Sequence, residues 1–431
     1  MRASSNPCPN SSAPTTSDPV HLRHLSLTNF RNYSRLELDL PLGVTIIQGQ
    51  NAQGKSNLLE AIVFLATGKS PRAGSDSELV NWLVRDEPYP FARAAAEVVR
   101  ASRTEQIDIT LLPNKGNGRF RKQVRIHGVN KRAMDLVGIM LTVLFRPEDV
   151  DLVSGSPSQR RRYLDIALCQ MEPAYCRALS HYQKVLAQRN ALLRNLAERG
   201  GDAGDQLRYW DEKLVESGSL VVARRQWLIN ELEKEAALIH LDLSGGVERL
   251  HLRYLPSFDP GQQPASARTP YPSTQVLRER GVAYAELSVD QARASFLAHL
   301  YAGRSRDLAA GMTLIGPHRD DLGFYLGERN LRTYGSRGQQ RTAALASKLA
   351  EVAIMTRVSG ESPILLLDDV MSELDATRRR MLLEVIPTVK QAIVTTTDWD
   401  YFSDDILTRA YRLHVHEGQI DEVENAGTQM G

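Results

Sequence analysis

The stretch Gly49-Gln50-Asn51-Ala52-Gln53-Gly54-Lys55-Ser56 decides the fold, because it joins two apolar runs of different kinds. Val44 to Ile47 predicts a strand before it, and Leu58 to Leu65 predicts an amphipathic helix after it. Glycines let the backbone curl around a phosphate chain, so that N–H groups and the helix N-terminus face the anion. Lys55 would reach the β- and γ-phosphates, and the Ser56 hydroxyl would hold Mg²⁺. We therefore expect a nucleoside-triphosphate site, the alternative being a glycine-rich turn that matches by chance.

Two carboxylates follow a second apolar run far downstream, where Ile364-Leu365-Leu366-Leu367 ends in Asp368-Asp369. Four consecutive apolar residues predict a strand covered on both faces, and ligands of open α/β sheets bind at the carboxyl ends of such strands. Asp368 would complete the Mg²⁺ shell, and Asp369 could orient or deprotonate the attacking water. The alternative is an acidic turn at the end of a strand.

Composition describes an ordinary globular chain of 431 residues, with 42% apolar and 24% charged residues. This length is sufficient for two domains that each bury a core. No run of 18 uncharged apolar residues and no signal-peptide core occurs, so we expect a cytoplasmic protein. Cys8, Cys169 and Cys176 form no Cys-x-x-Cys motif and are interpreted as free thiols.

Net charge is only +2, so a nucleic-acid partner would have to be contacted by local clusters of basic residues. Three clusters are candidates, although most such runs are solvated faces of helices or hairpins. They are Arg160 to Arg162, Arg378 to Arg380, and the group of Arg119, Arg121, Lys122 and Arg125.

Hydrophobic periodicity changes along the chain. Residues 91–146 contain short runs of alternating apolar and polar residues, separated by turns, and these predict antiparallel hairpins. In 159–237 the apolar residues have helical spacing. Pro256 to Thr274 predicts a long loop, followed by helix from Leu277 to Ala310 and a return of the sheet pattern by Leu322.

A second helix start suited to an anion precedes the acidic strand. Ser336 is a candidate N-cap, Gly338 leaves backbone N–H groups open, and Ala343 to Val358 predicts the helix. One nucleotide cannot easily use both helix termini of a single subunit. The arrangement therefore favours a site shared between two subunits, although Gly-Ser caps are also common without any ligand.

Taken in order, these motifs resemble the ABC-type ATPase heads of the SMC class, and within that class the RecF family of bacterial DNA replication and repair proteins. The resemblance covers about 21–420. It is carried by Asn29 to Tyr33, the P-loop Gly49–Ser56, Pro147 to Asp165, Leu314 to Asp321, the signature motif Ser336-x-Gly338-Gln339, the strand ending at Asp368-Asp369, and Ser372-Glu373-Leu374-Asp375.

The resemblance implies an α/β fold, an ABC-type P-loop ATPase head with a helical lobe inserted in it. Residues 1–20 fall outside the resemblance; their Ser, Pro and Thr content predicts a disordered tail, or an artefact of start-site choice at Val20. Residues 21–150 would form the N-terminal half of the ATPase lobe, 151–310 the helical lobe, and 311–431 the C-terminal half with the signature motif and the acidic strand.

The resemblance also implies an ATP-dependent homodimer. ATP and Mg²⁺ would lie between Gly49–Ser56, Asp368 and Asp369 of one subunit and Ser336, Gly338 and Gln339 of the other. Asp375 would cross the interface and Arg31 would lie near the nucleotide. Thr395 to Thr397 stand where transporter-type relatives place a switch histidine, and Asp369 stands where they place glutamate. Both departures predict slow hydrolysis, hence a weak, DNA-stimulated ATPase that acts as a timed switch.

The family role would be ATP-dependent binding of duplex and single-stranded DNA at gap junctions. There, with RecO and RecR, the protein would assist RecA loading and support the SOS response.

Four other classes fit the sequence less well. A transporter ATPase would have its signature motif much closer to the P-loop, and a chromosome-structuring SMC protein would contain long heptad arrays. An OLD-type nuclease would append a nuclease domain after the ATPase. A P-loop small-molecule kinase has no need of Ser336-x-Gly338-Gln339 and is the main alternative from another class.

Overall fold

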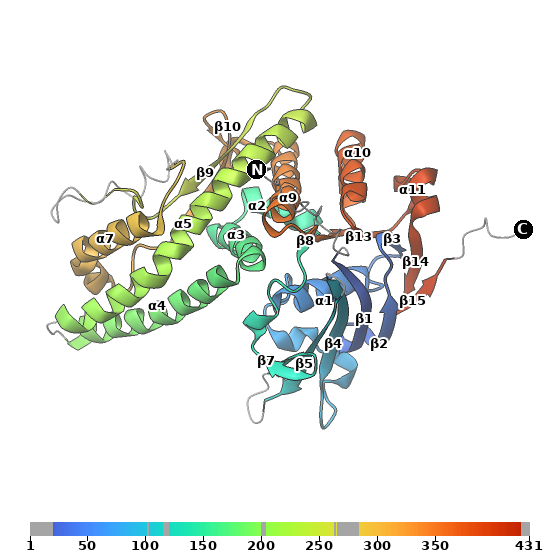
Figure 1. Cartoon of the computed structure of the whole chain (residues 1–431), viewed down its shortest axis with the longest axis horizontal. Coiled ribbons are helices and arrows are strands. Elements are labelled where there is room, and N and C mark those ends of the chain that lie inside the picture. Colours follow the sequence, from blue (N-terminus) through green and yellow to red (C-terminus); the bar gives the residue numbers. More distant parts are fainter. Residues whose placement is uncertain are drawn as a thin grey trace, which may run out of the picture.

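The computed structural model describes residues 20–423, apart from 101–102, 115–119, 200–203, 263 and 265–283. The tail predicted for 1–20 therefore lies outside the described residues except for Val20, as does most of the loop predicted for 256–274. Figure 1 shows two lobes, one built on two sheets and one built mainly of long helices. No helix in the described part of the chain is long and apolar enough to cross a membrane.

A six-stranded sheet in the order β15-β14-β3-β13-β12-β8 forms the base of the lobe that is built on two sheets. The strands from β14 to β8 pair in parallel, and only β15 is antiparallel. Every residue of β12 and β13 is buried, which confirms the strand predicted before Asp368. The strand bounds are β3 Gly43–Gln48, β8 Thr142–Phe145, β12 Ile364–Asp368, β13 Gln391–Thr396, β14 Tyr411–His416 and β15 Gln419–Glu422.

A second six-stranded sheet, in the order β2-β1-β4-β5-β6-β7, is antiparallel throughout. It contains the hairpins predicted within 91–146. The strand bounds are β1 His21–Phe30, β2 Tyr33–Asp39, β4 Ala92–Arg100, β5 Arg103–Pro113, β6 Phe120–Ile126 and β7 Val129–Lys131.

Helix α1 (Lys55–Thr67) lies between these two sheets and contacts strands of both. Leu58 to Ala66 are all buried, including Glu60. The prediction of an amphipathic helix here is wrong, because a helix packed between two sheets has no solvent face. This burial fixes the helix N-terminus, and therefore the P-loop, at the carboxyl edge of β3.

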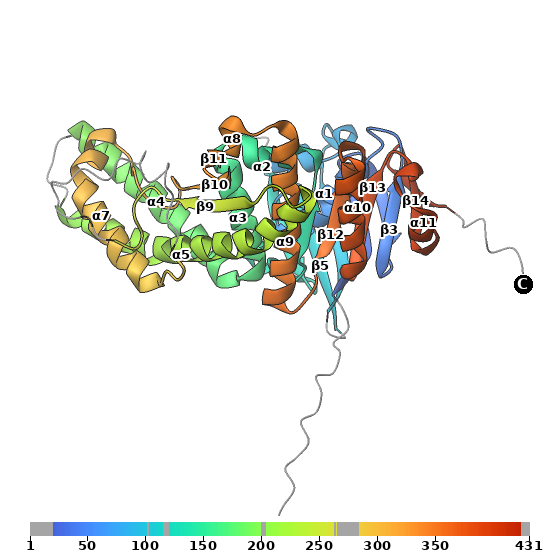
Figure 2. The same cartoon turned by 90° about the horizontal axis from the view of Figure 1, so that it is seen from above.

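The second lobe is built from long helices that project away from the sheets (Figures 1 and 2). Its helices are α3 Pro157–Met171, α4 Pro173–Arg199, α5 Gly204–Leu243 and α7 Val289–Ala310. Helix α7 ends where predicted but begins later, at Val289, because the side chains of Ser288 and Gln291 form a capping box there. The part of the prediction from Leu277 to residue 283 lies outside the described residues.

A three-stranded sheet, in the order β11-β10-β9, completes this lobe. β9 (Leu250–Leu255) pairs antiparallel with β10 (Asp321–Leu326), and β11 (Arg329–Asn330) follows as a short hairpin partner. The sheet pattern expected by Leu322 is therefore real, but its partner strand comes from the inserted region.

Helix α9 (Arg337–Ser359) packs against α5 and against β8, so it joins the helical lobe to the base sheet. The remaining short helices lie near the sheet edges and the joints between lobes. They are α2 Asp151–Ser154, α8 Leu331–Tyr334, α10 Ala376–Val385 and α11 Asp404–Arg409.

Candidate nucleotide-binding site

The P-loop connects β3 to α1, as predicted, and its shape depends on Gly54. This residue has a backbone angle φ of 120°, which residues with a side chain rarely adopt. A Cβ atom at Gly54 would lie 2.6 Å from Asn32 Nδ2 and 3.0 Å from Tyr33 Oη. Gly54 thus allows both the unusual backbone angle and the close approach of the strand that follows β1.

The β1–β2 turn holds the P-loop from outside. Asn32 Nδ2 donates a 2.9 Å hydrogen bond to the Gln53 carbonyl, and the Tyr33 hydroxyl donates a 3.0 Å bond to the Gly54 carbonyl. On the other side, the β14–β15 turn contributes the Glu417 N–H, which donates to Gln53 Oε1 at 2.6 Å. Sequence reasoning missed these roles, although Asn32 and Tyr33 stand in a motif that it singled out.

Lys55 folds back over the loop that it terminates. Its Nζ donates to the carbonyls of Gly49 at 2.5 Å and Gln50 at 3.0 Å. Burial lowers the pKa of Lys55, and the charges of Asp369 and Asp368 oppose that shift. The ammonium group is therefore held inside the phosphate loop, where it can exchange carbonyl oxygens for phosphate oxygens.

Ser56 and Asp368 lie in direct contact across the sheet. The Ser56 hydroxyl donates a 2.7 Å hydrogen bond to Asp368 Oδ1, and the Thr395 hydroxyl approaches the same oxygen at 3.2 Å. Burial raises the pKa of Asp368, while the bonds from Ser56 and Thr395 oppose the increase. A hydroxyl and a carboxylate at this distance fit one hard divalent cation.

No group of three or more His, Cys, Asp or Glu side chains suited to a metal occurs among the described residues. A cation at Ser56 and Asp368 would therefore need phosphate and water oxygens to complete its shell, as Mg²⁺ commonly does in nucleotide sites. The donor set fits a metal that arrives with the nucleotide.

Asp369 has an unsatisfied carboxylate oxygen. Its backbone is left-handed, with φ = 51°, and its N–H donates to Thr395 Oγ1 at 3.0 Å. Oδ1 is buried and has no hydrogen-bond partner among the described residues. Burial raises the pKa of Asp369, and Lys55 opposes that shift. An orphaned buried oxygen beside Lys55 fits a group that bonds water or a nucleotide.

Arg31 does not project freely toward the P-loop. Its Nε and Nη2 each donate a 2.8 Å bond to the buried carboxylate of Glu60 on α1, and Nη1 donates to the Glu78 carbonyl at 2.8 Å. This fork joins the turn after β1 to the middle of α1. Arg31 thus anchors α1, and its contact with the nucleotide remains a prediction.

The signature segment forms the predicted N-terminus of α9. The Ser336 hydroxyl accepts from the Gln339 N–H at 3.2 Å, and Gln339 Oε1 accepts from the Ser336 N–H at 2.9 Å. Gln339 Nε2 also donates to Glu248 at 2.6 Å. Ser336 is exposed, and a Cβ atom at Gly338 would meet nothing closer than 3.8 Å. The helix terminus is open to a ligand.

Asp375 caps α10 and is tied to the signature segment through Arg378. Its carboxylate accepts from the Arg378 N–H at 3.0 Å and forms an ion pair with the same side chain. Arg378 also donates to Thr342 Oγ1 at 2.6 Å and to the Gly338 carbonyl at 3.3 Å. Sequence reasoning missed Arg378 as a link because it placed this residue only in a basic cluster.

The candidate residues therefore fall into two groups. Lys55, Ser56, Asp368 and Asp369 meet at one sheet edge, whereas Ser336, Gly338, Gln339 and Asp375 gather at the start of α9. Within the described part of the chain, no hydrogen bond or ion pair joins the second group to the P-loop.

The basic clusters are largely engaged inside the protein. Arg160 is buried and forms a two-pronged ion pair with Asp321 at 2.7 and 2.9 Å. Arg379 stacks over Tyr401, with 4.7 Å from its guanidinium carbon to the ring centroid. Lys122 donates to the Gly68 carbonyl at 2.6 Å. Arg119 lies outside the described residues.

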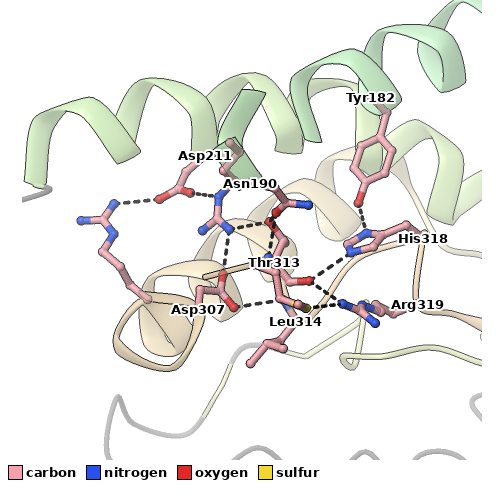
Figure 3. Close-up of polar contacts among 11 residues, drawn as sticks. Tyr182, Asn190, Asp211, Asp307, Thr313, Leu314, His318 and Arg319 are labelled. Atoms are coloured by element: carbon pink, nitrogen blue, oxygen red, sulfur yellow. Dashed lines mark hydrogen bonds and ion pairs between the residues drawn. The ribbon is translucent and has the colours of Figure 1, made fainter. Parts of the chain in front are cut away.

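The segment Leu314–Asp321 braces the helical lobe (Figure 3). The Tyr182 hydroxyl bonds His318 Nδ1 at 2.6 Å, and His318 Nε2 donates to the Thr313 carbonyl at 3.2 Å. Deeper in the lobe, buried Arg189 bonds Asp211, Asp307 and Thr313 at 2.7 to 2.8 Å. These contacts join α4, α5 and α7 to Thr313 and to the segment that follows it.

Comparison with known proteins places these features in one family. The family model RecF/RecN/SMC N terminal domain matches residues 21–421. A relative from Chloroflexus aurantiacus, a DNA replication and repair protein RecF, is 44% identical over 93% of this chain and 99% of its own length. A protein of the same name from Geobacillus thermodenitrificans is 39% identical, with the same coverage.

Solved structures give the same result. The recombination mediator protein RecF with ATP, in the RecFOR pathway, has a TM-score of 0.78 and 30% identity, covering 96% of this chain and 100% of its own. The structure of RecF-ATPrS from the same pathway has a TM-score of 0.77 and 32% identity, covering 95% of this chain and 99% of its own.

Proposed function

The chain belongs to the RecF/RecN/SMC N-terminal domain family, within its RecF branch, and we propose that it is a DNA replication and repair ATPase whose ATP-bound form is a homodimer. The observation that carries this proposal is the division of the nucleotide-binding residues into two groups. Among the described residues, no hydrogen bond or ion pair joins the open helix N-terminus at Ser336 to the P-loop group, which favours a second subunit as the source of donors for the γ-phosphate.

In this proposal, the P-loop N–H groups and Lys55 bind the phosphate chain of ATP. Ser56 Oγ and the Asp368 carboxylate would hold Mg²⁺, which neutralises phosphate charge when bound. Ser336, Gly338 and Gln339 of a second subunit would close over the γ-phosphate. Asp375 reaches that contact through the same helix end, because Arg378 ties it to the Gly338 carbonyl.

Asp369 would orient the attacking water and accept its proton. An aspartate carboxylate extends less far than a glutamate carboxylate. The neighbouring strand β13 contributes Thr395, whose hydroxyl accepts a hydrogen bond from the Asp369 N–H. We therefore propose slow hydrolysis that limits the lifetime of the dimer. The protein would bind DNA at single-strand/duplex junctions in this dimeric state and, with RecO and RecR, assist RecA loading during gap repair and the SOS response.

Mixing two inactive variants tests the shared site. Lys55→Ala removes the P-loop cation, and Ser336→Arg blocks the signature helix, so neither variant alone should dimerise or hydrolyse ATP. In the mixture, one of the two sites of each heterodimer contains both wild-type halves. Light scattering and ATPase assays should therefore show partial recovery in the mixture, with binding to a gapped duplex recovered in parallel.

The control is the exposed Lys390→Ala variant at the amino end of β13, which should behave like wild type. Absence of recovery in the mixture, with both variants folded, would contradict a composite site. Recovery of ATPase without binding to gapped DNA would support the shared nucleotide site and contradict the proposed DNA role.

A further inference from the structure

A cleft of about 790 Å³ lies between the two lobes, apart from the P-loop and signature residues. Its lining comes from the segment that follows α1, from Lys122 of β6 and from the segment 133–137, together with residues of α3 and α4. Ligand-binding clefts typically measure about 300–1,000 Å³. The volume is therefore that of a site for a small molecule or for the end of a larger one.

Three cations on the walls of this cleft form no ion pair with a carboxylate in the part of the chain that the structure describes. Arg162 donates to the Ser70 carbonyl at 2.6 Å, and Arg161 donates to the Asp320 carbonyl at 2.8 Å. Lys69 is exposed, and no hydrogen bond or ion pair within the described residues holds its ammonium group. Carbonyl oxygens satisfy donors without neutralising charge, so the positive charge of these groups remains available.

The acidic residues of the cleft are already paired. Asp165 accepts two bonds from Arg225 Nη2, at 2.8 and 3.0 Å, and Asp76 pairs with Lys122 at 3.1 Å. Burial lowers the pKa of Arg161 and the charge of Arg225 lowers it further, while the charges of Asp320, Asp321 and Asp165 oppose the shift. The cleft therefore carries an excess of positive charge in partly desolvated surroundings, where an anion is bound more strongly than in water.

The rest of the lining is mixed, with the apolar Ala73, Met134, Val137, Ile166 and Leu179 beside polar side chains such as those of Ser158, Ser180 and Gln183. A wall of this kind suits a nucleobase or a sugar, while the guanidinium forks suit phosphate. We propose that the cleft binds a nucleotide through its phosphate, either free or at the end of a single strand, as a second site separate from the ATP site. This inference does not rest on the ATP-dependent dimer proposed above.

Cys176 provides a reporter inside the cleft. A hydrogen bond from Cys169 lowers the pKa of Cys176 to about 7, and Lys69 and Arg177 contribute to the same shift. Both cysteines line the cleft and are partly accessible. A phosphate bound to Lys69 would cover the Cys176 thiolate and cancel part of the charge that stabilises it. Alkylation of Cys176 should then slow, because the thiolate is the reactive form.

The experiment follows iodoacetamide modification of Cys176 by peptide mass spectrometry, with five probes. These are thymidine, thymidine 5′-monophosphate, pyrophosphate, and a thymidine tetranucleotide with and without a 5′-phosphate. Binding predicts that the phosphorylated probes slow alkylation roughly five-fold or more, and that thymidine has no effect. Stronger protection by the 5′-phosphorylated tetranucleotide than by the mononucleotide would assign the site to strand ends, and the reverse would assign it to free nucleotides.

Variants separate this site from the P-loop. Lys69→Ala should weaken the protection, and Lys69→Ala/Arg162→Gln should abolish it, whereas Lys390→Ala and Lys55→Ala should retain it. The Lys69 ammonium group forms no hydrogen bond or ion pair with the described residues, so Lys69→Ala should fold and remains informative if the double variant unfolds. Equal protection by thymidine, no protection by any probe, or loss of protection in Lys55→Ala would each overturn the proposal.

Discussion

Among single residues, Asp369 and Asp368 are neighbours in sequence with different surroundings. Asp368 Oδ1 is hydrogen-bonded to Ser56 and Thr395, whereas Asp369 Oδ1 is buried without a partner among the described residues. The first arrangement suits a fixed metal ligand, and the second suits a group that engages a transient water. Neighbouring carboxylates can therefore have separate roles at the end of one strand.

We predict that Asp369→Asn lowers the single-turnover rate of ATP hydrolysis about 10²-fold or more, because the amide cannot accept the proton. ATP affinity should change only a few-fold, since Lys55 and the loop N–H groups remain. Equilibrium nucleotide binding and quenched-flow hydrolysis measure the two effects separately, with Lys55→Ala as the variant that loses binding. An unchanged hydrolysis rate would mean that another group activates the water.

His318 makes folding stability depend on pH. Burial lowers its pKa to about 4, so the folded protein binds no proton there between pH 6.5 and that value, while the unfolded chain does. The contribution of neutral His318 to the free energy of unfolding is fully present above pH 6.5. It is lost as pH falls, and the loss at pH 5 is about 2 kcal/mol. Urea unfolding at pH 7.5 and pH 5 should show a smaller difference for His318→Asn than for wild type.

Exposed His416→Gln is the matched control and should leave the pH dependence as in wild type. His240 and His299 also have pKa values lowered by burial, so wild-type stability should decline below pH 6.5 even without His318. A pH dependence that is identical in His318→Asn and wild type would contradict the role given to this side chain.

At the scale of elements, a buried ion pair fixes the junction between α3 and β10. Arg160 is almost fully buried and bonds both oxygens of Asp321 as well as the Gly155 carbonyl. We predict that Arg160→Met destabilises the protein by about 3 kcal/mol, because the half-buried Asp321 carboxylate loses its partner. Arg160→Met/Asp321→Leu should recover most of that loss.

The measurement is urea unfolding at pH 7.5. Arg35→Gln, a substitution of an exposed arginine on β2, should change the free energy of unfolding by less than about 0.5 kcal/mol. A double variant that is no more stable than Arg160→Met would indicate that the arginine stabilises the junction through packing and through the Gly155 bond more than through charge.

The sequence predicted elements where local patterns decide them. The apolar run before Asp368 correctly predicted β12, and Ser336 correctly predicted the start of α9. It failed where the answer depends on contacts between distant segments. Nothing local to α1 shows that two sheets enclose it, and nothing near Leu322 identifies β9 as its partner. Periodicity reports which residues are buried, but not what covers them.

The same limit applies to the site. Glycine, lysine and serine at fixed spacing identify the P-loop, because phosphate binding demands those residues locally. Asn32 and Arg378 act on backbone carbonyls distant in sequence, at Gln53 and Gly338, and no spacing rule predicts such bonds. The basic clusters were ambiguous for a related reason, since the partners of Arg160 and Arg379 come from other elements.

For the whole molecule, ligand binding and association should appear together in thermal melts. ATP with Mg²⁺ should stabilise the folded protein by about 2.7 kcal/mol at a hundred-fold excess over Kd, and the shift should increase with protein concentration if two subunits share the nucleotide. Ser336→Arg should retain a ligand-dependent shift but lose its dependence on protein concentration. Lys55→Ala should show neither effect. A wild-type shift that is independent of protein concentration would argue for a monomeric ATP complex.

The pairing of β3 with β13 also determines when, during synthesis of the chain, the protein can first bind a nucleotide. Gln48 lies opposite Thr396, so the strand that carries the P-loop has no neighbour on that side until nearly the whole chain has left the ribosome. At about 5–20 residues per second, the wait is tens of seconds. Prematurely terminated chains would contain the P-loop sequence without the sheet that shapes it. Such fragments could not compete with the finished protein for ATP.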